Sequence, residues 1–171
     1  MRRPLLLLLL VLATPLWAAE PRDLAWTEMI PEGAPSAPES QAPMHESQGN
    51  DGPGDESGPP AAQMSPAAPV VKALDGQLVR LPGYLVPLET DSDGRVREFL
   101  LVPYFGACIH VPPPPSNQIV HVRNEPGVQL EVLYQPYWVE GRLQVEHISS
   151  ELAAAGYRIT TSKVYPYQLE H

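Results

Sequence analysis

The chain has 171 residues, among them 22 prolines and 12 glycines, so about one residue in five interrupts regular secondary structure. This content excludes a helical bundle, and the length indicates one domain. The formal net charge is -9. Proteins that bind nucleic acid or anionic lipid carry basic patches, so we expect no nucleic-acid partner for this acidic chain.

Residues 1–19 have the features of a secretory signal peptide. Two arginines precede an apolar run over residues 5–12, and the small residues Ala18 and Ala19 follow. The run is shorter than the roughly 20 residues that a membrane-spanning helix needs, and no cysteine at the boundary offers a site for a lipid. We therefore expect export, with cleavage at the end of this segment and no direct membrane anchor afterwards.

Two further segments precede the predicted domain. In residues 20–31, the residues Trp26, Met29 and Ile30 have the spacing of one helical turn that can pack onto the domain as a returning arm. Residues 32–69 are rich in Pro, Ser, Gly, Ala, Gln and acidic residues, and they contain no Lys or Arg. Few apolar side chains and charge of one sign cannot offset the entropy of ordering, so we predict a disordered, acidic, proline-rich linker.

Residues 70–171 have the alternation of apolar and polar residues that is typical of short β-strands. Strands are predicted over 77–88, 97–104, 117–123, 129–140, 143–146 and 157–167, with turns at Asp91–Gly94 and Gly141–Arg142. The stretch HISSELAAA, residues 147–155, predicts the one helix, which a serine caps and Gly156 ends. Five or six strands and one short helix indicate a mainly β domain, a small OB-like Greek-key barrel.

The segment 103–122, PYFGACIHVPPPPSNQIVHV, contains the single cysteine, two of the five histidines and a run of four prolines. Residues two apart in a strand face the same side, so Cys108 and His110 can point to one face. The prolines form a stiff polyproline II connection, after which the next strand can bring His121 towards that face. A thiolate with two imidazoles suits zinc or copper, with water, a carboxylate or His147 as a fourth ligand.

The same residues allow two other interpretations. Cys108 can be a buried residue of a metal-free interaction module whose aromatic residues dock a membrane complex: Tyr134, Tyr137 and Trp138. Alternatively, one of the two histidines can deprotonate Cys108 in a thiol hydrolase or transferase. An exposed thiol without a disulfide partner is open to oxidation in an oxidising compartment. We therefore expect Cys108 to be buried, to bind a metal ion or to take part in thiol chemistry. The absence of C-x-x-C and C-x-x-C-H excludes redox disulfide and haem c sites.

Four stretches resemble a bacterial family of exported proteins of unknown function. They are WTEMIP at 26–31, GYLVPLE at 83–89, REFLLVPYFGACIHVPPPPSNQIVHV at 97–122 and VEG at 139–141. The cysteine, histidine and proline residues of the longest stretch are the specific signature. The resemblance implies a periplasmic protein of a kind that is often encoded beside an ABC transporter with an FtsX-like permease and, in some bacteria, within zinc-responsive gene clusters.

From the residues and this resemblance we predict a periplasmic accessory protein in zinc handling, not an enzyme. Cys108, His110 and His121 would bind one metal ion, zinc or alternatively copper, with an exchangeable fourth position. The expected partner is the ABC transporter permease or another periplasmic component. Binding would depend on pH, because Cys108 must lose its proton to become a ligand.

Overall fold

The fold is described from a computed structural model, which places residues 20–34, 62–63, 65–108, 112–130 and 134–168. The predicted signal peptide and most of the predicted linker lie outside these residues. The described part contains strands and short 3-10 turns, and none of its helices has the length and hydropathy of a membrane-crossing segment. The strands are β1 (Arg22–Asp23), β2 (Leu78–Thr90), β3 (Arg95–Val102), β4 (Val120–Gln129), β5 (Tyr137–Ser149) and β6 (Ala154–Pro166), and the turns are η1 (Trp26–Met29), η2 (Lys72–Leu74) and η3 (Ser116–Gln118).

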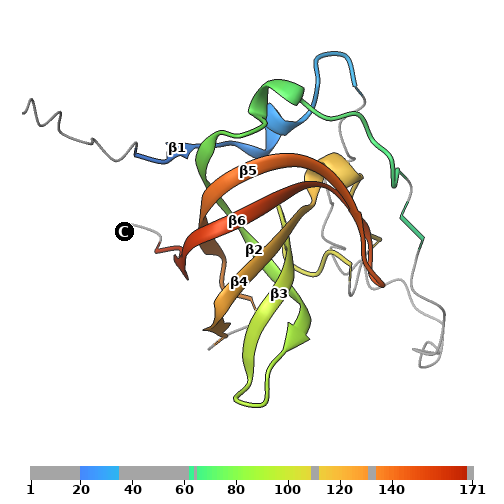
Figure 1. Cartoon of the computed structure of the whole chain (residues 1–171). Helices are drawn as coiled ribbons and strands as arrows, with labels where there is room; N and C mark the ends of the chain where they lie inside the picture. Colours follow the sequence, from blue (N-terminus) through green and yellow to red (C-terminus); the bar gives the residue numbers. More distant parts are fainter. Residues whose placement is uncertain (1–19, 35–61, 64, 109–111, 131–133, 169–171) are drawn as a thin grey trace, which may run out of the picture.

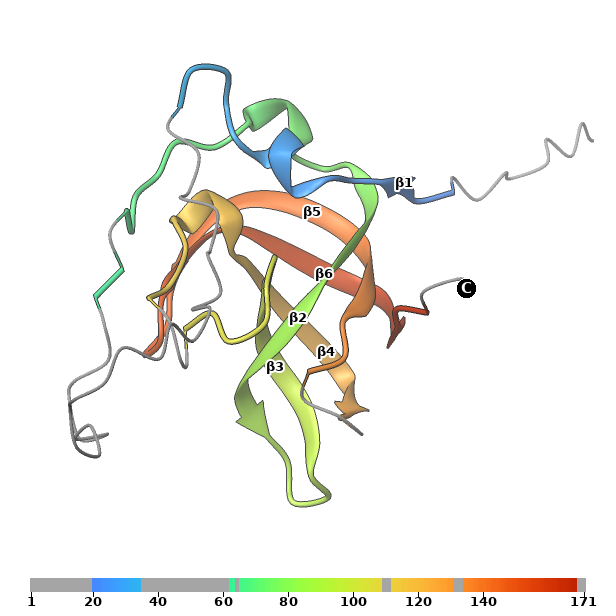
Figure 2. The ribbon, with the colours of Figure 1, turned by 180° about the vertical axis from the view of Figure 1, so that it is seen from behind.

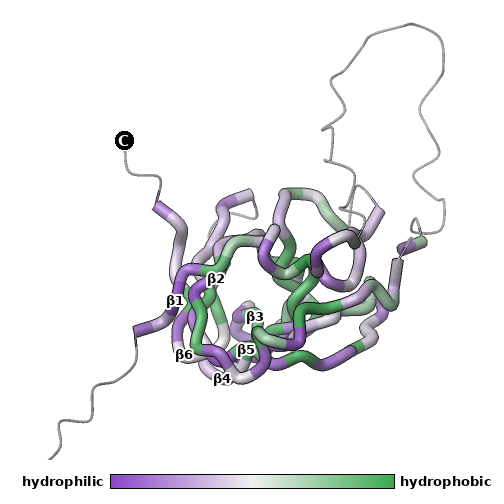
Figure 3. Tube along the Cα trace, turned by 90° about the horizontal axis from the view of Figure 1, so that it is seen from above, coloured by the Kyte–Doolittle hydropathy of each residue, from purple (hydrophilic) through white to green (hydrophobic). Residues whose placement is uncertain are grey.

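Strands β2 to β6 form a closed barrel (Figures 1 and 2). The sheet order is β1-β2-β3-β4-β6-β5, and β5 pairs back with β2. Neighbours are antiparallel except β1–β2 and β4–β6, which are parallel. Figure 3, seen from above, shows the strands arranged as a ring. The prediction of a mainly β barrel and of a tight Asp-Gly turn before β3 is confirmed.

Strand β2 closes the barrel because it pairs with two partners in succession. Its first half pairs with β5 up to Gly83 opposite Tyr137, and its second half pairs with β3 from Tyr84 opposite Val102. A Cβ on Gly83 would lie 2.7 Å from the carbonyl oxygen of Val102. Pro82 and Gly83, which predict an edge strand or a bulge, thus mark a corner of the barrel.

Alternation along the strands produces two apolar clusters on opposite faces. Inward side chains form the inner core, which includes Phe99, Leu101, Val120, Val122 and Tyr157. Residues that alternate with them on β2 and β3 form the outer cluster, together with residues of neighbouring segments. The outer cluster consists of Val86, Leu100, Val102, Ala107, Cys108, Ile119, Ala153 and Ala155. Strand β3 is therefore apolar on both faces along its second half.

The N-terminal segment packs across one end of the barrel (Figure 1). Strand β1 pairs with β2, and η1, which forms where Trp26, Met29 and Ile30 predict a turn, buries Met29 completely. The hydroxyl of buried Tyr157 donates to the Met29 carbonyl at 2.8 Å and accepts the Val71 N–H at 2.7 Å. One core residue thus holds segments from both sides of the predicted linker.

The helix predicted over 147–155 is wrong. Strands β5 and β6 occupy this stretch and are joined by a tight turn at 150–153. The Ser150 hydroxyl accepts two backbone N–H groups of the turn, at 3.1 and 3.3 Å, and this local bonding competes with helix formation. Gly156, which follows this turn on β6, permits a close approach, because a Cβ there would lie 2.9 Å from Cγ1 of Val70.

The turn predicted at Gly141 is also wrong, because β5 runs through this residue without interruption. A Cβ on Gly141 would clash with the carbonyl oxygen of Thr160 and lie 2.7 Å from Cγ2 of Ile159. The glycine therefore permits β5 and β6 to approach closely. The strand predicted over 129–140 is displaced, since β5 begins at Tyr137.

Candidate functional site

Two polar side chains interrupt the apolar outer face of the barrel. Glu98 on β3 and His121 on β4 alternate with inner-core residues, so both point outward. Two neighbours of His121 belong to the outer cluster. They are Ile119, two residues earlier in the chain, and Leu100, which is paired with His121 in the register of β3 and β4. Cys108 belongs to the same cluster, so one face of the barrel carries both Cys108 and His121.

Glu98 fixes the orientation of the His121 ring. Nε2 of His121 lies 2.7 Å from Oε1 of Glu98, and the two side chains are 5% and 26% exposed. A carboxylate only accepts, so Nε2 carries the proton and donates it. The other ring nitrogen, Nδ1, is buried and has no hydrogen-bond partner among the described residues. In its neutral form the imidazole therefore has a free lone pair on Nδ1.

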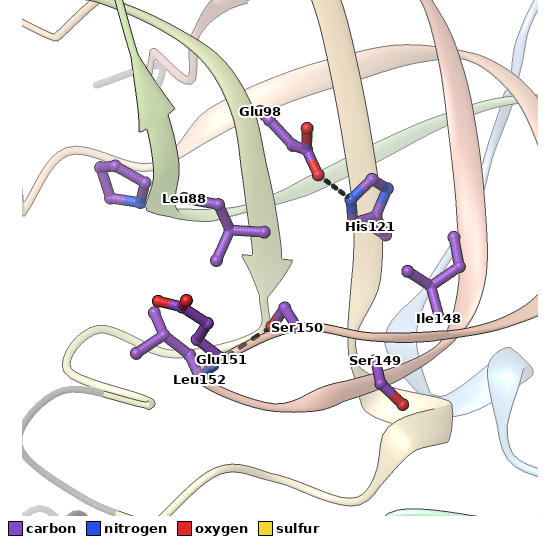
Figure 4. A pocket seen from close by; sticks show the side chains of 9 residues that line it. Leu88, Glu98, His121, Ile148, Ser149, Ser150, Glu151 and Leu152 are labelled. Carbon is purple, nitrogen blue, oxygen red and sulfur yellow. Dashed lines mark hydrogen bonds and ion pairs between the residues drawn. The ribbon is translucent and has the colours of Figure 1, made fainter.

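Glu98 and His121 line a pocket of about 370 Å³, which we call the outer-face pocket. Figure 4 shows Glu98 and His121 on one side, Glu151 and Leu152 on the other, and Leu88 between them. The described residues that line the pocket are Pro87, Leu88, Glu98, His121, Ile148, Ser149, Ser150, Glu151 and Leu152. The second wall is thus the β5–β6 turn, and no Lys or Arg is among the lining residues.

Cys108 is buried in the outer cluster, with 8% exposure. Its φ of 67° is the one positive value at a non-glycine residue in the described ranges, and this conformation is uncommon for a residue with a side chain. Burial raises the pKa of the Cys108 thiol to about 11. The thiol is therefore protonated at neutral pH, and it does not have the lowered pKa of an activated nucleophile.

The end of the predicted linker is bound to the barrel. Nε2 of Gln63 donates to the carbonyl oxygens of Pro114 and Ala154, at 2.8 and 3.0 Å, and Oε1 accepts the Ala154 N–H at 2.9 Å. Residues 65–69 form further hydrogen bonds with η3. We call Gln63 and residues 65–69 the strap. The folded domain therefore starts before Val70, and the strap joins the polyproline segment to β6.

A family model described as a protein of unknown function, DUF3299, matches residues 26–166. The chain belongs to the DUF3299 family. It is similar to a DUF3299 family protein from Pseudomonas aeruginosa PAO1, known from a crystal structure at 2.45 Å resolution. The two are 58% identical with a TM-score of 0.76, and the match covers 90% of this chain and 100% of the other. A comparison with curated proteins gives no match.

In this DUF3299 protein, two of the three predicted metal ligands lie on one face. Cys108 and His121 are both on the outer face, whereas His110 lies outside the described residues. His147, considered as a fourth ligand, is exposed on β5. In the part of the chain that the structure describes, no three His, Cys, Asp or Glu side chains are grouped as a metal site.

The three aromatic residues of the interaction-module interpretation do not form one surface in the DUF3299 protein. Tyr137 belongs to the inner core, whereas Tyr134 is 70% exposed. The Trp138 ring lies beneath the Arg80 guanidinium, 4.6 Å from its centroid, and packs against Tyr167. A docking surface built from these three residues together is therefore wrong, because the strand alternation directs Tyr137 inward.

Sequence reasoning missed the two carboxylates of the outer-face pocket, Glu98 and Glu151. Glu98 stands two residues before Leu100 and directly before the apolar stretch 99–102, so period-two alternation places it on the outer face beside His121. This signal was available. Glu151 could not be placed, because residues 147–155 predict a helix and the pocket wall that they form is a turn.

Proposed function

We propose that this DUF3299 protein binds a metal ion, zinc or copper, through Nδ1 of His121. The observation that supports the proposal is a buried histidine whose Nε2–H is donated to Glu98 while Nδ1 has no partner among the described residues. Metal-ligating histidines almost always donate the second ring nitrogen to a carboxylate, carbonyl or water, which fixes the tautomer and raises ligand basicity. A buried polar atom without a partner is unfavourable, and a metal ion would satisfy it.

Cys108 and His110 complete the proposed ligand set. Thiolate and imidazole are donors that zinc and copper accept. A bound metal ion deprotonates a coordinating thiol, so a thiol with a pKa of about 11 can still become a ligand. Binding then releases the Cys108 proton, and the affinity increases with pH below this pKa. A fourth position stays open for water or for a ligand of the partner.

We further infer that the barrel is OB-like. Five strands in the order β2-β3-β4-β6-β5, closed by β2–β5 pairing and with β4 parallel to β6, support this assignment. OB-folds bind ligands on the face of their second and third strands, between the first and the last inter-strand loops. In this chain those strands are β3 and β4, which carry Glu98 and His121, and the last loop is the β5–β6 turn. The outer-face pocket therefore lies where an OB-like barrel binds its ligands.

The proposed role is that of a periplasmic accessory protein that transfers its metal ion to an ABC transporter permease or another periplasmic component. The signal-peptide features of residues 1–19 and the family resemblance support this location and partner. The acidic residues of segment 32–69 would weakly raise the local cation concentration. A thiol hydrolase or transferase is disfavoured, because burial raises the pKa of Cys108 rather than lowering it.

The test is the metal content of the protein purified without an affinity tag, followed by zinc titration of the metal-free protein. His121→Ala, Cys108→Ser and His110→Ala should each remove the bound metal. Glu98→Gln should retain the site with an affinity about 10- to 100-fold lower, because the carboxylate no longer orients the ring. His147→Ala changes an exposed histidine of β5 and is the matched control. A metal-free protein that does not bind added zinc would overturn the proposal.

A further inference from the structure

Two carboxylates, Glu98 and Glu151, are among the described side chains that line the outer-face pocket. Oε1 of Glu98 accepts from His121, and Oε2 has only the Arg123 guanidinium, at 3.8 Å. Glu151 has no ion pair with any described residue. Nδ1 of His121, on a side chain that is 5% exposed, has no partner in the described chain. Acceptors of this kind favour a ligand with a positive charge and several N–H donors.

The remaining lining is largely apolar and suits the rest of such a ligand. Pro87, Leu88, Ile148 and Leu152 form these walls. Long basic side chains place their methylene groups along apolar surface and keep the charged end among polar groups. The volume of about 370 Å³ is at the small end of the range for ligand pockets. The pocket therefore fits one long side chain better than a large cofactor.

Exposed apolar residues beside the pocket indicate that a protein presents this side chain. Leu152 is 36% exposed at the pocket and Phe105 is 51% exposed. The Phe105 ring contacts Tyr84 edge to face, with centroids 5.9 Å apart. Tyr84 and Leu88 both pack against the outer cluster and alternate along β2, so an apolar strip leads from Phe105 to the pocket. A small cation would leave this strip uncovered, whereas a protein segment would bury it.

We infer that the outer-face pocket binds a Lys or Arg side chain of a partner protein, with apolar neighbours of that side chain lying on the strip from Phe105 to Leu88. Glu98 and Glu151 bind the charged end, and Leu88 and Leu152 contact its methylene groups. The inference needs no bound metal ion, because carboxylates and apolar walls account for it. It is therefore tested on the metal-free protein in the presence of a chelator.

The probe is the peptide acetyl-Leu-Arg-Leu-amide, and its control is the same peptide with citrulline, which has the shape of arginine without the charge. Backbone amide shifts are followed by NMR during titration of the full chain. We expect saturable shifts at Leu88, Glu151 and Leu152 with the arginine peptide, and binding about tenfold weaker with citrulline. Glu151→Gln should weaken binding about twofold to fivefold, as for an exposed ion pair.

Glu32→Gln is the matched charge control, because Glu32 is exposed, has no ion pair with a described residue and lies outside the pocket. It should leave the affinity unchanged. Equal binding of the citrulline peptide, or equal effects of Glu151→Gln and Glu32→Gln, would overturn the inference. If free arginine amide binds as tightly as the peptide, the inference of a protein partner is wrong, and the pocket binds a small cation instead.

Discussion

The inner core and the outer cluster are formed by the same strands, yet they differ in their surroundings. The inner core is enclosed by the barrel and contains apolar side chains and two tyrosines, Tyr137 and Tyr157. The outer cluster contains Cys108 and includes residues of two irregular segments, namely residues 103–108 and the β5–β6 turn. Stability and chemistry are thus separated: the barrel interior determines the fold, and the polar site lies on a second apolar face, to which segments outside the strands contribute.

The largest effect should come from Gly141, on the inner-core side of this comparison. Gly141→Ala places a methyl group against the carbonyl oxygen of Thr160. This is a backbone atom, so it cannot move aside as the end of a flexible side chain could. We expect a loss of more than about 3 kcal/mol in the free energy of unfolding, measured by denaturant titration. Gly94→Ala is the control: its φ of 76° is strained for alanine but no atom lies within 4 Å of the added methyl, so the loss should be about 1 kcal/mol. Equal losses would show that β5 and β6 can separate at little cost.

The second-largest effect is expected at Cys108, and it tests whether the outer cluster excludes water from the thiol. Burial raises the pKa of its thiol from 9.0 to about 11, so the folded state favours the neutral thiol. The stabilisation is complete below about pH 9 and is lost as the pH rises to about 11. The loss over this window should be about 2 to 3 kcal/mol in the wild type and absent in Cys108→Ala. The comparison between the two proteins removes the contribution of the tyrosines, which titrate in the same range. A parallel pH dependence of both proteins would show that water reaches the thiol.

Much of the barrel is predictable from sequence, because strand alternation and the Asp-Gly turn are local signals. The failures are non-local. Gly141 predicts a turn when only its neighbours are considered, whereas the strand partner β6 requires it for close approach. The alanines before Gly156 predict a helix by propensity, yet Ala153 and Ala155 pack in the outer cluster beside the β5–β6 turn. Propensity was overridden by contacts with residues distant in the sequence.

The candidate site is predictable only in part, for the same reason. The composition of segment 103–122 indicates Cys108 and His121, and alternation alone places Glu98 on the same face. Whether Cys108 is buried, and whether Nδ1 of His121 has a partner among the described residues, depends on contacts in three dimensions that no periodic pattern indicates. Gln63 could not be found at all, because its segment has the composition of a disordered linker.

The smallest effect should come from the strap, and it tests whether the irregular segments of the outer cluster can open. Gln63→Ala removes three hydrogen bonds that join the polyproline segment to Ala154. We expect a loss of about 1 kcal/mol in the free energy of unfolding, together with alkylation of Cys108 about tenfold faster under native conditions, because local opening becomes easier. Gln144→Ala, on an exposed position of β5, is the control and should change neither quantity. Alkylation at the wild-type rate in Gln63→Ala would contradict the role of the strap, since Cys108 would then become accessible through another opening. Faster alkylation with nearly unchanged global stability would instead show that the outer cluster opens independently of the inner core, which is the property that a site for exchange of a metal ion requires.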